Sequence, residues 1–302
     1  MKQVASVVLS VILLLSLCAC GKKETAATWQ EQYDLGVRYL AEGDHKEAII
    51  AFTAAIEIDQ KNVDAYLSLV AAYVATGDYG SVEELFSKAC DSDMREIDVK
   101  LLANRILQSP ELSITSQMID ASDFMIGGKE IGRCTLSEFM DIFPNNTDTY
   151  DDPLSEREHG GKSGITYTPC LRRIDGSYHT GLIWAWARSV SSKIGVAVFE
   201  GNDTVDFDFN SIQTGDNVET VLDKMGLSEL GKKCCLMIGS PVTFELSQDG
   251  KWCAYSMGQG EMVDEENYGF LICDSQHGGI IHLEFEGEIL SFVQYNELDW
   301  QW

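Results

Sequence analysis

Two stretches of the chain share one order of residues: YDLGVRYLAEGDHKEAIIAFTAA at 33–55 and LSLVAAYVATGDYGSVEELFSKA at 67–89. They lie 34 residues apart. The first stretch carries the shared positions as Leu35, Tyr39, Gly43, Asp44, Ala48, Phe52 and Ala55, and the second carries them as Leu69, Tyr73, Gly77, Asp78, Val82, Phe86 and Ala89. Apolar positions at helical spacing on both sides of a Gly-Asp turn predict helix pairs that stack on one another.

This pattern resembles the tetratricopeptide repeat, in which each unit is a helix, a tight turn and a second helix. Gly36 fits the small position of the first helix, whereas Val70 in the second copy departs from it. Gln60 stands where the family has a helix-ending Pro. The resemblance implies two repeats, at 29–62 and 63–96.

A closing helix is expected at 97–107, after the second repeat. Its apolar stripe would consist of Ile97, Leu101, Leu102 and Ile106. Pro110 cannot continue a helix, so the repeat domain is expected to span 29–109 and the next domain 111–302.

The resemblance implies that the repeats bind a protein or peptide along the face formed by their first helices. The candidate partner-binding residues on that face are Tyr33, Val37, Leu67, Ala71 and Val74. An alternative is that this mainly apolar face packs on the next helix or on the second domain, because stacked repeats cover one another's faces.

The first twenty residues predict a secretory signal. Lys2 precedes an almost wholly apolar run, Val4–Leu17, which is too short to span a bilayer comfortably. The following Leu17-Cys18-Ala19-Cys20 resembles the lipobox of bacterial lipoproteins. The resemblance implies a signal peptide at 1–19, lipid such as palmitate on Cys20 and a tether at 20–28. Two or three acyl chains would hold the protein at the extracytoplasmic face of the cell membrane, exposed at the cell surface. An ordinary cleaved signal is the alternative.

Composition excludes some partners. The formal charge is −26, and removal of residues 1–19 takes away only Lys2, which makes it −27. Such a chain is not expected to bind nucleic acid, because Lys and Arg contacts to phosphate dominate that binding. Seven irregularly spaced cysteines follow Cys20, and they are interpreted as mostly free, buried thiols.

Residues 111–302 predict an α+β domain, an antiparallel sheet covered by two short capped helices. Thr135 with Glu138, and Asp216 with Glu219, are read as capping boxes. The predicted strands are 165–174, 182–188, 194–199, 242–246, 252–257, 270–273, 280–285 and 289–295. Strand-like segments at 124–131 and 205–209 precede the two helices and suggest an internal duplication, whereas 145–164 is predicted to be an exposed loop.

No pattern in the chain predicts a catalytic, metal or cofactor site, so the chain is not expected to be an enzyme. The histidines lack metal-ligand spacing, and the pairs Cys170–His179 and Cys273–His277 are interpreted as coincidences. Trp184 and Trp186 are candidate stacking residues, because strand spacing places both on one face. The alternative is that they fill the core. The leading hypothesis is a tethered scaffold that binds a protein through its repeats. The second is a lipoprotein whose β-rich domain holds a glycan or peptide.

Overall fold

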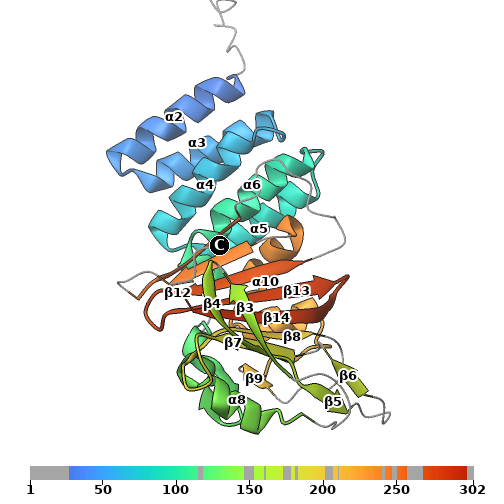
Figure 1. The fold of residues 1–302 in the computed structure, drawn as a ribbon. Helices are drawn as coiled ribbons and strands as arrows, with labels where there is room; N and C mark the ends of the chain where they lie inside the picture. Colours follow the sequence, from blue (N-terminus) through green and yellow to red (C-terminus); the bar gives the residue numbers. More distant parts are fainter. Residues whose placement is uncertain are drawn as a thin grey trace, which may run out of the picture. The chain divides into compact units, whose positions relative to one another are not determined.

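The computed structural model describes residues 27–114, 118–145, 153–159, 161–172, 178–180, 183–200, 207–209, 211–239, 242–246, 250–256 and 268–297, which are drawn in colour in Figure 1. Cys20 and the predicted signal lie outside these residues. Within them, no helix is both long and apolar enough to cross a membrane.

The chain divides into two compact units. The first contains the residues up to Asp78 together with Asp91–Met94, and the second contains Tyr79–Cys90 and the chain from Arg95 onward. This division falls inside the second predicted repeat. The boundary expected near Pro110 marks the end of the repeat pattern in the sequence. The division into units follows the contacts between residues in the structure, so the two need not coincide.

Three helices form the first unit: α2 (Trp29–Glu42), α3 (His45–Ile58) and α4 (Val63–Thr76). A capping box between Thr28 and Glu31 begins α2. Gly43 and Gly77 end α2 and α4 with φ of 80° and 73°, a left-handed conformation that favours glycine. The two Gly-Asp turns of the sequence pattern are therefore confirmed.

The core of the first unit lies around Phe52 of α3, which is fully buried. Gly36 of α2 faces it so closely that a Cβ atom there would come within 2.6 Å of the Phe52 ring. The Tyr33 ring also packs on Phe52, with a centroid separation of 5.8 Å. The small first-helix residue is thus required by the aromatic side chain of the paired helix.

The second unit begins with α5 (Tyr79–Cys90), α6 (Glu96–Leu107) and the short α7 (Pro110–Ser113). Helix α6 packs on α10 (Glu229–Ile238), and Lys233 of α10 forms an ion pair with Glu83 of α5 at 2.9 Å. The sequence did not predict α10. Its N-cap is Ser228, whose side chain accepts the N–H of Gly231.

The predicted stripe of the closing helix is partly wrong. Leu102 and Ile106 are buried, but Ile97 and Leu101 are 59% and 41% exposed. The buried residues of α6 are instead Asp98, Val99, Leu102, Ala103, Ile106 and Leu107. These residues follow the spacing of one helical face, which is rotated from the predicted stripe.

A nine-stranded sheet dominates the second unit (Figure 1). The strand order is β11-β10-β12-β13-β14-β8-β7-β4-β3. Neighbouring strands in this sheet are antiparallel, except that β10 and β12 are parallel. Its strands are β3 (Leu154–His159), β4 (Lys162–Tyr167), β7 (Ile183–Ala187), β8 (Ile194–Glu200), β10 (Val242–Leu246), β11 (Trp252–Ser256), β12 (Gly269–Asp274), β13 (Gly279–Glu286) and β14 (Ile289–Glu297). The α+β class is confirmed.

Smaller elements complete the second unit. Strands β5 (Cys170–Arg172) and β6 (Tyr178–Thr180) form a hairpin. Strands β1 (Phe124–Ile126), β2 (Lys129–Glu130) and β9 (Phe207–Phe209) form a three-stranded sheet. The short 3-10 helices are η1 (Ala121–Asp123) and η2 (Ile131–Arg133).

The structure corrects four local predictions. Strand β3 lies within the segment 145–164 that was expected to be a loop, and its charged sequence fits an edge strand. The segment 124–131 is a hairpin turned by Gly127 and Gly128 and not one strand. The segment 165–174 is divided between β4 and β5. Finally, Asn217, and not Asp216, caps α9 (Val218–Lys224), whereas Asp216 accepts the N–H of Gln213.

The two predicted strand-helix units occupy corresponding places. Strands β1 and β9 pair antiparallel. The cap of α8 (Leu136–Ile142) bridges to Lys193 just before β8, and the cap of α9 bridges to Ile289 at the start of β14. The strands β8 and β14, to which the two caps connect, are antiparallel neighbours, and the suggested internal duplication stays a prediction.

The faces of the nine-stranded sheet differ. On one face, Phe199 of β8 packs against Phe139 of α8 and Phe124 of β1, with centroid separations of 6.3 Å and 5.6 Å. The alternate residues of β7 and β8 point to the other face, where Trp186, Val196 and Val198 form a buried cluster. We call this second surface the Trp face. It comprises the residues of β7, β8, β13 and β14 that point to the same side as Trp186.

Candidate functional site

The first-helix face of the repeats is a candidate partner-binding surface in the first unit. Tyr33, Leu67, Ala71 and Val74 are half-buried, and Val37 is 43% exposed. On the same helices, Gly36, Leu69 and Val70 are buried. The candidate residues therefore keep surface that a partner can touch, although the Tyr33 ring also packs on Phe52.

The charges beside this face are mostly acidic, although the exposed Arg38 lies one helical turn from Asp34 on α2. Gln30 and Asp34 of α2 share a hydrogen bond of 2.9 Å, and Asp64 of α4 is exposed. We take the first-helix face to comprise positions 30, 33, 37, 40 and 41 on α2 and 64, 67, 71, 74 and 75 on α4, and none of these residues is Lys or Arg. This apolar surface with acidic residues at its margin suits a partner that is apolar and basic.

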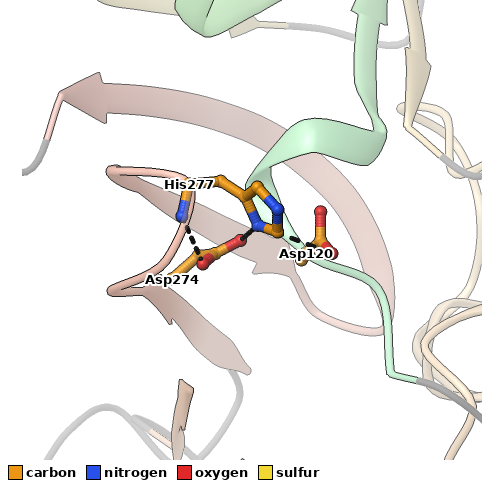
Figure 2. Close-up of side chains that lie close together, drawn as sticks. All are labelled: Asp120, Asp274 and His277. Carbon is orange, nitrogen blue, oxygen red and sulfur yellow. Dashed lines mark hydrogen bonds and ion pairs between the residues drawn. The ribbon is translucent and has the colours of Figure 1, made fainter. Parts of the chain in front are cut away.

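A second cluster in the other unit consists of Asp120, Asp274 and His277 (Figure 2). His277 Nδ1 lies 2.8 Å from Asp274 Oδ2 and 3.6 Å from Asp120 Oδ2. Asp274 is fully buried, and its carboxylate accepts the backbone N–H groups of Ala121, Gln276 and His277. The bond from Ala121 joins residues 153 positions apart in the chain.

The hydrogen bonds of this cluster favour a structural role. Asp120 caps η1 by accepting the N–H of Ser122, and its Oδ1 also bonds the Ser122 hydroxyl. The three ligand atoms lie within 4.8 Å of one another, so the set has the dimensions of a cation site. Both oxygens of Asp274 are nevertheless already engaged by N–H groups. The cluster therefore acts as a clamp between η1 and the β12–β13 turn.

The charge of His277 depends on this cluster. The hydrogen bond to Asp274 is the main cause that raises the pKa of His277 above 6.5, and the charges of Asp120 and Glu130 add to it. The sequence prediction missed the cluster, because Asp120 is remote in the chain. The only local signal is that Asp274 and His277 are three residues apart.

A shallow cavity of about 400 Å³ lies nearby, lined by Ser122, Met125, Lys129, Glu130, Arg133 and Glu138. Lys129 pairs with Glu138, and Arg133 pairs with Glu130 at 3.0 Å. Its two cations are therefore already neutralised, and the cavity offers no uncompensated charge to a ligand.

The two candidate stacking tryptophans have different surroundings. Trp186 is 1% exposed, and its indole N–H donates to the Arg157 carbonyl at 3.2 Å, so this residue belongs to the core. Trp184 is half-buried and stacks on His159 with a centroid separation of 5.3 Å. Only Trp184 keeps ring surface that a ligand can reach.

Neither Cys170 with His179 nor Cys273 with His277 has the geometry or protonation expected of a nucleophilic Cys–His pair. The register of β5 and β6 pairs His179 with Leu171, whereas Cys170 pairs with Thr180. Burial raises the pKa of Cys273 to about 11, so its thiol is protonated at neutral pH. His277 is bonded to Asp274, as described above.

Paired helices, glycine turns and a half-exposed first-helix face together define a helical-repeat region. Residues 39–106 match the tetratricopeptide repeat family. The match runs from the end of α2 into α6, and it indicates a scaffold for protein–protein interaction. No curated protein matches the chain.

Proposed function

We propose that this chain is a lipid-anchored, extracytoplasmic scaffold without catalytic activity, whose repeats dock a protein partner. The observation that carries the docking is the half-exposed apolar face of α2 and α4 within a repeat family that binds proteins. The lipobox-like Leu17-Cys18-Ala19-Cys20 supports the anchor.

The partner is proposed to present a basic segment with apolar side chains. Tyr33 and Leu67 would supply the apolar contacts, and aromatic residues commonly dominate such interfaces. Asp34 and Asp64 at the margin, together with the net charge of −26, would attract a positively charged segment and speed its association.

Site-specific photocrosslinking in the full membrane-expressed chain tests this proposal. A photoreactive amino acid at position 33 or 67 should capture one basic protein, whereas the same group at position 50 should not. Ile50 is a suitable control because it is apolar and 61% exposed but lies on α3. Capture should also weaken as salt is raised, because salt screens exposed charges.

Alanine variants separate docking from internal packing. Tyr33→Ala and Leu67→Ala should reduce partner binding about tenfold or more. Leu67→Ala should leave the melting temperature of the full chain nearly unchanged, whereas Tyr33→Ala should lower it slightly, because the Tyr33 ring also packs on Phe52. If both variants strongly destabilise the full chain instead, the face is an internal seam. Equal crosslinking at position 50 would also contradict the proposal.

A further inference from the structure

We propose that the Trp face of the nine-stranded sheet binds a neutral oligosaccharide. Trp184 and Phe292 would stack on the sugar rings, and the side chains of His282, Gln294 and Asn296 would bond the hydroxyl groups. This activity is separate from the docking of a protein on the repeats.

Strand register places these residues together. Trp184 of β7 is opposite Val198 of β8, Val198 is opposite Gln294 of β14, and Gln294 is opposite His282 of β13. Residues that face one another across strands share one face of the sheet. This row crosses three strand spacings, or about 14 Å. It therefore has the length of an oligosaccharide and not of a single sugar.

Aromatic surface borders this row. Trp184 and Phe292 are partly buried and pack on the buried cluster of Trp186, Val196 and Val198. His159 also stacks on Trp184 with a centroid separation of 5.3 Å, so a sugar would contact the part of the Trp184 ring that His159 and the cluster leave uncovered. Ligand sites typically combine such aromatic walls with a few polar groups. His282 lies beside Phe292, with a centroid separation of 6.1 Å.

A buried amide lacks an acceptor in this place. Asn296 is 3% exposed, and its Nδ2 has no hydrogen-bond partner among the residues that the structure describes, although its Oδ1 accepts a bond of 3.0 Å from Gln294. The hydroxyl of Thr166, opposite Trp186 on β4, is buried as well and has no partner within the described part of the chain. Unsatisfied buried polar groups are rare, and a ligand oxygen in contact with Asn296 would remove one of them.

The charges favour a neutral ligand. Among the described residues of the Trp face on β7, β8, β13 and β14, none is Lys or Arg. Burial lowers the pKa of His282, so its ring is neutral at pH 7, although Glu284 lies 3.3 Å away. Because the chain as a whole is strongly acidic, an anionic sugar would also be repelled.

The position on the sheet argues against a peptide. Peptides that bind sheets typically add a strand at an edge, where backbone N–H and C=O groups are free. The edges of this sheet are β3 and β11, whereas β8, β13 and β14 are interior strands paired on both sides. A ligand on these interior strands can therefore bind only through ring stacking and side-chain hydrogen bonds, and both suit the hydroxylated rings of a sugar.

Tryptophan fluorescence and calorimetry of the full chain in detergent test the proposal. The probes are hexasaccharides of β-1,4-glucose, β-1,4-xylose, α-1,4-glucose and N-acetylglucosamine, with hexagalacturonate as the anionic comparison and a library of short peptides. At least one neutral probe should bind with a Kd of about 1 mM or tighter.

Variants decide whether the binding occurs at the Trp face. Trp184→Ala and Gln294→Ala should each weaken it about tenfold, whereas Trp184→Phe should retain most of it. Trp252→Ala is the matched control, because Trp252 is opposite Leu246 on β11 and β10, in the same sheet but on the other face. It should leave the affinity unchanged.

Three results would overturn the proposal. These are no binding of any neutral probe at about 10 mM, binding that Trp184→Ala leaves intact, and binding only of a peptide or of hexagalacturonate. Each variant is compared with the wild type by thermal melting, and the milder Trp184→Phe and Gln294→Ala keep the test valid if Trp184→Ala fails to fold.

Discussion

At the scale of single residues, the repeat pattern identifies packing partners correctly. Phe52 was one of the residues that repeat after 34 positions, and it is fully buried against Gly36. The absence of a side chain on α2 leaves the space that the ring of α3 fills. Close packing of this kind makes the site sensitive to any change of volume.

Phe52→Ala should lower the free energy of unfolding by about 3–5 kcal/mol, because it removes a large buried ring and leaves a cavity. Ile50→Ala is the matched control, since Ile50 lies on the same helix and is 61% exposed. It should change stability by about 0.5 kcal/mol or less. Urea unfolding measures both, and a loss near zero for Phe52→Ala would show that the 34-residue register is misassigned.

His277 predicts a dependence of stability on pH. Its pKa is raised from 6.5 in the folded chain, mainly by its hydrogen bond to Asp274. A raised folded-state pKa contributes stability that is fully present below the unfolded value and is lost as pH rises through the folded value. The stability advantage of the wild type over His277→Gln should therefore be larger at about pH 5.5 than at about pH 9.

Thermal melting of both proteins across this range measures the difference. The side chain of His277 is 37% exposed, so solvent screens part of the effect. A difference between wild type and variant that does not change with pH would show that His277 bears no charge in the clamp.

At the scale of elements, Gly164 decides how β4 joins the sheet. A Cβ atom there would come within 2.5 Å of the Ala187 carbonyl oxygen and would also overlap the Trp186 ring. Both neighbours belong to β7, which pairs with β4. The hairpin of β3 and β4 can therefore join β7 only because residue 164 has no side chain.

Gly164→Ala should destabilise the full chain by about 2 kcal/mol or more, because neither the backbone oxygen nor the buried ring can give way. Gly80→Ala is the matched control, since Gly80 lies in helix α5 with nothing within 4 Å of its added Cβ. It should raise stability slightly, by up to about 1 kcal/mol. Calorimetry compares the two, and equal melting temperatures would contradict the close contact of β4 and β7.

At the scale of the whole molecule, the chain combines a repeat scaffold with an α+β sheet domain, and the proposed anchor precedes both. The strong negative charge of the chain limits its contacts with anionic headgroups, so the lipid would be the membrane attachment.

Cys20→Ser should therefore release or mislocalise the protein, because the lipid would have no thiol to join. Cys18→Ser is the matched control and should leave anchoring intact, because the bulky Leu17 before Cys18 makes it a poor lipid acceptor. Fractionation with metabolic lipid labelling measures both variants, together with the length of the N-terminus. A wild-type mature protein that is free of the membrane and carries no lipid would overturn the anchor.

The sequence by itself determined the features that depend on neighbouring residues. Helical spacing, the Gly-Asp turns, the capping box at Thr135 and most strands of the large sheet could be predicted, because each follows from local backbone preferences and apolar periodicity.

Only the tertiary structure decided features that depend on distant residues. The exposure of Ile97 on α6 and the parallel pairing of β10 with β12 are two such features. The burial of Trp186 in the core, whereas Trp184 is only half-buried, is a third. The tertiary structure also joined Asp120 to His277, and Trp184 to the row that contains Gln294. A single chain carries no local signal for such contacts, since they arise when strands and helices far apart in sequence bury their surfaces together.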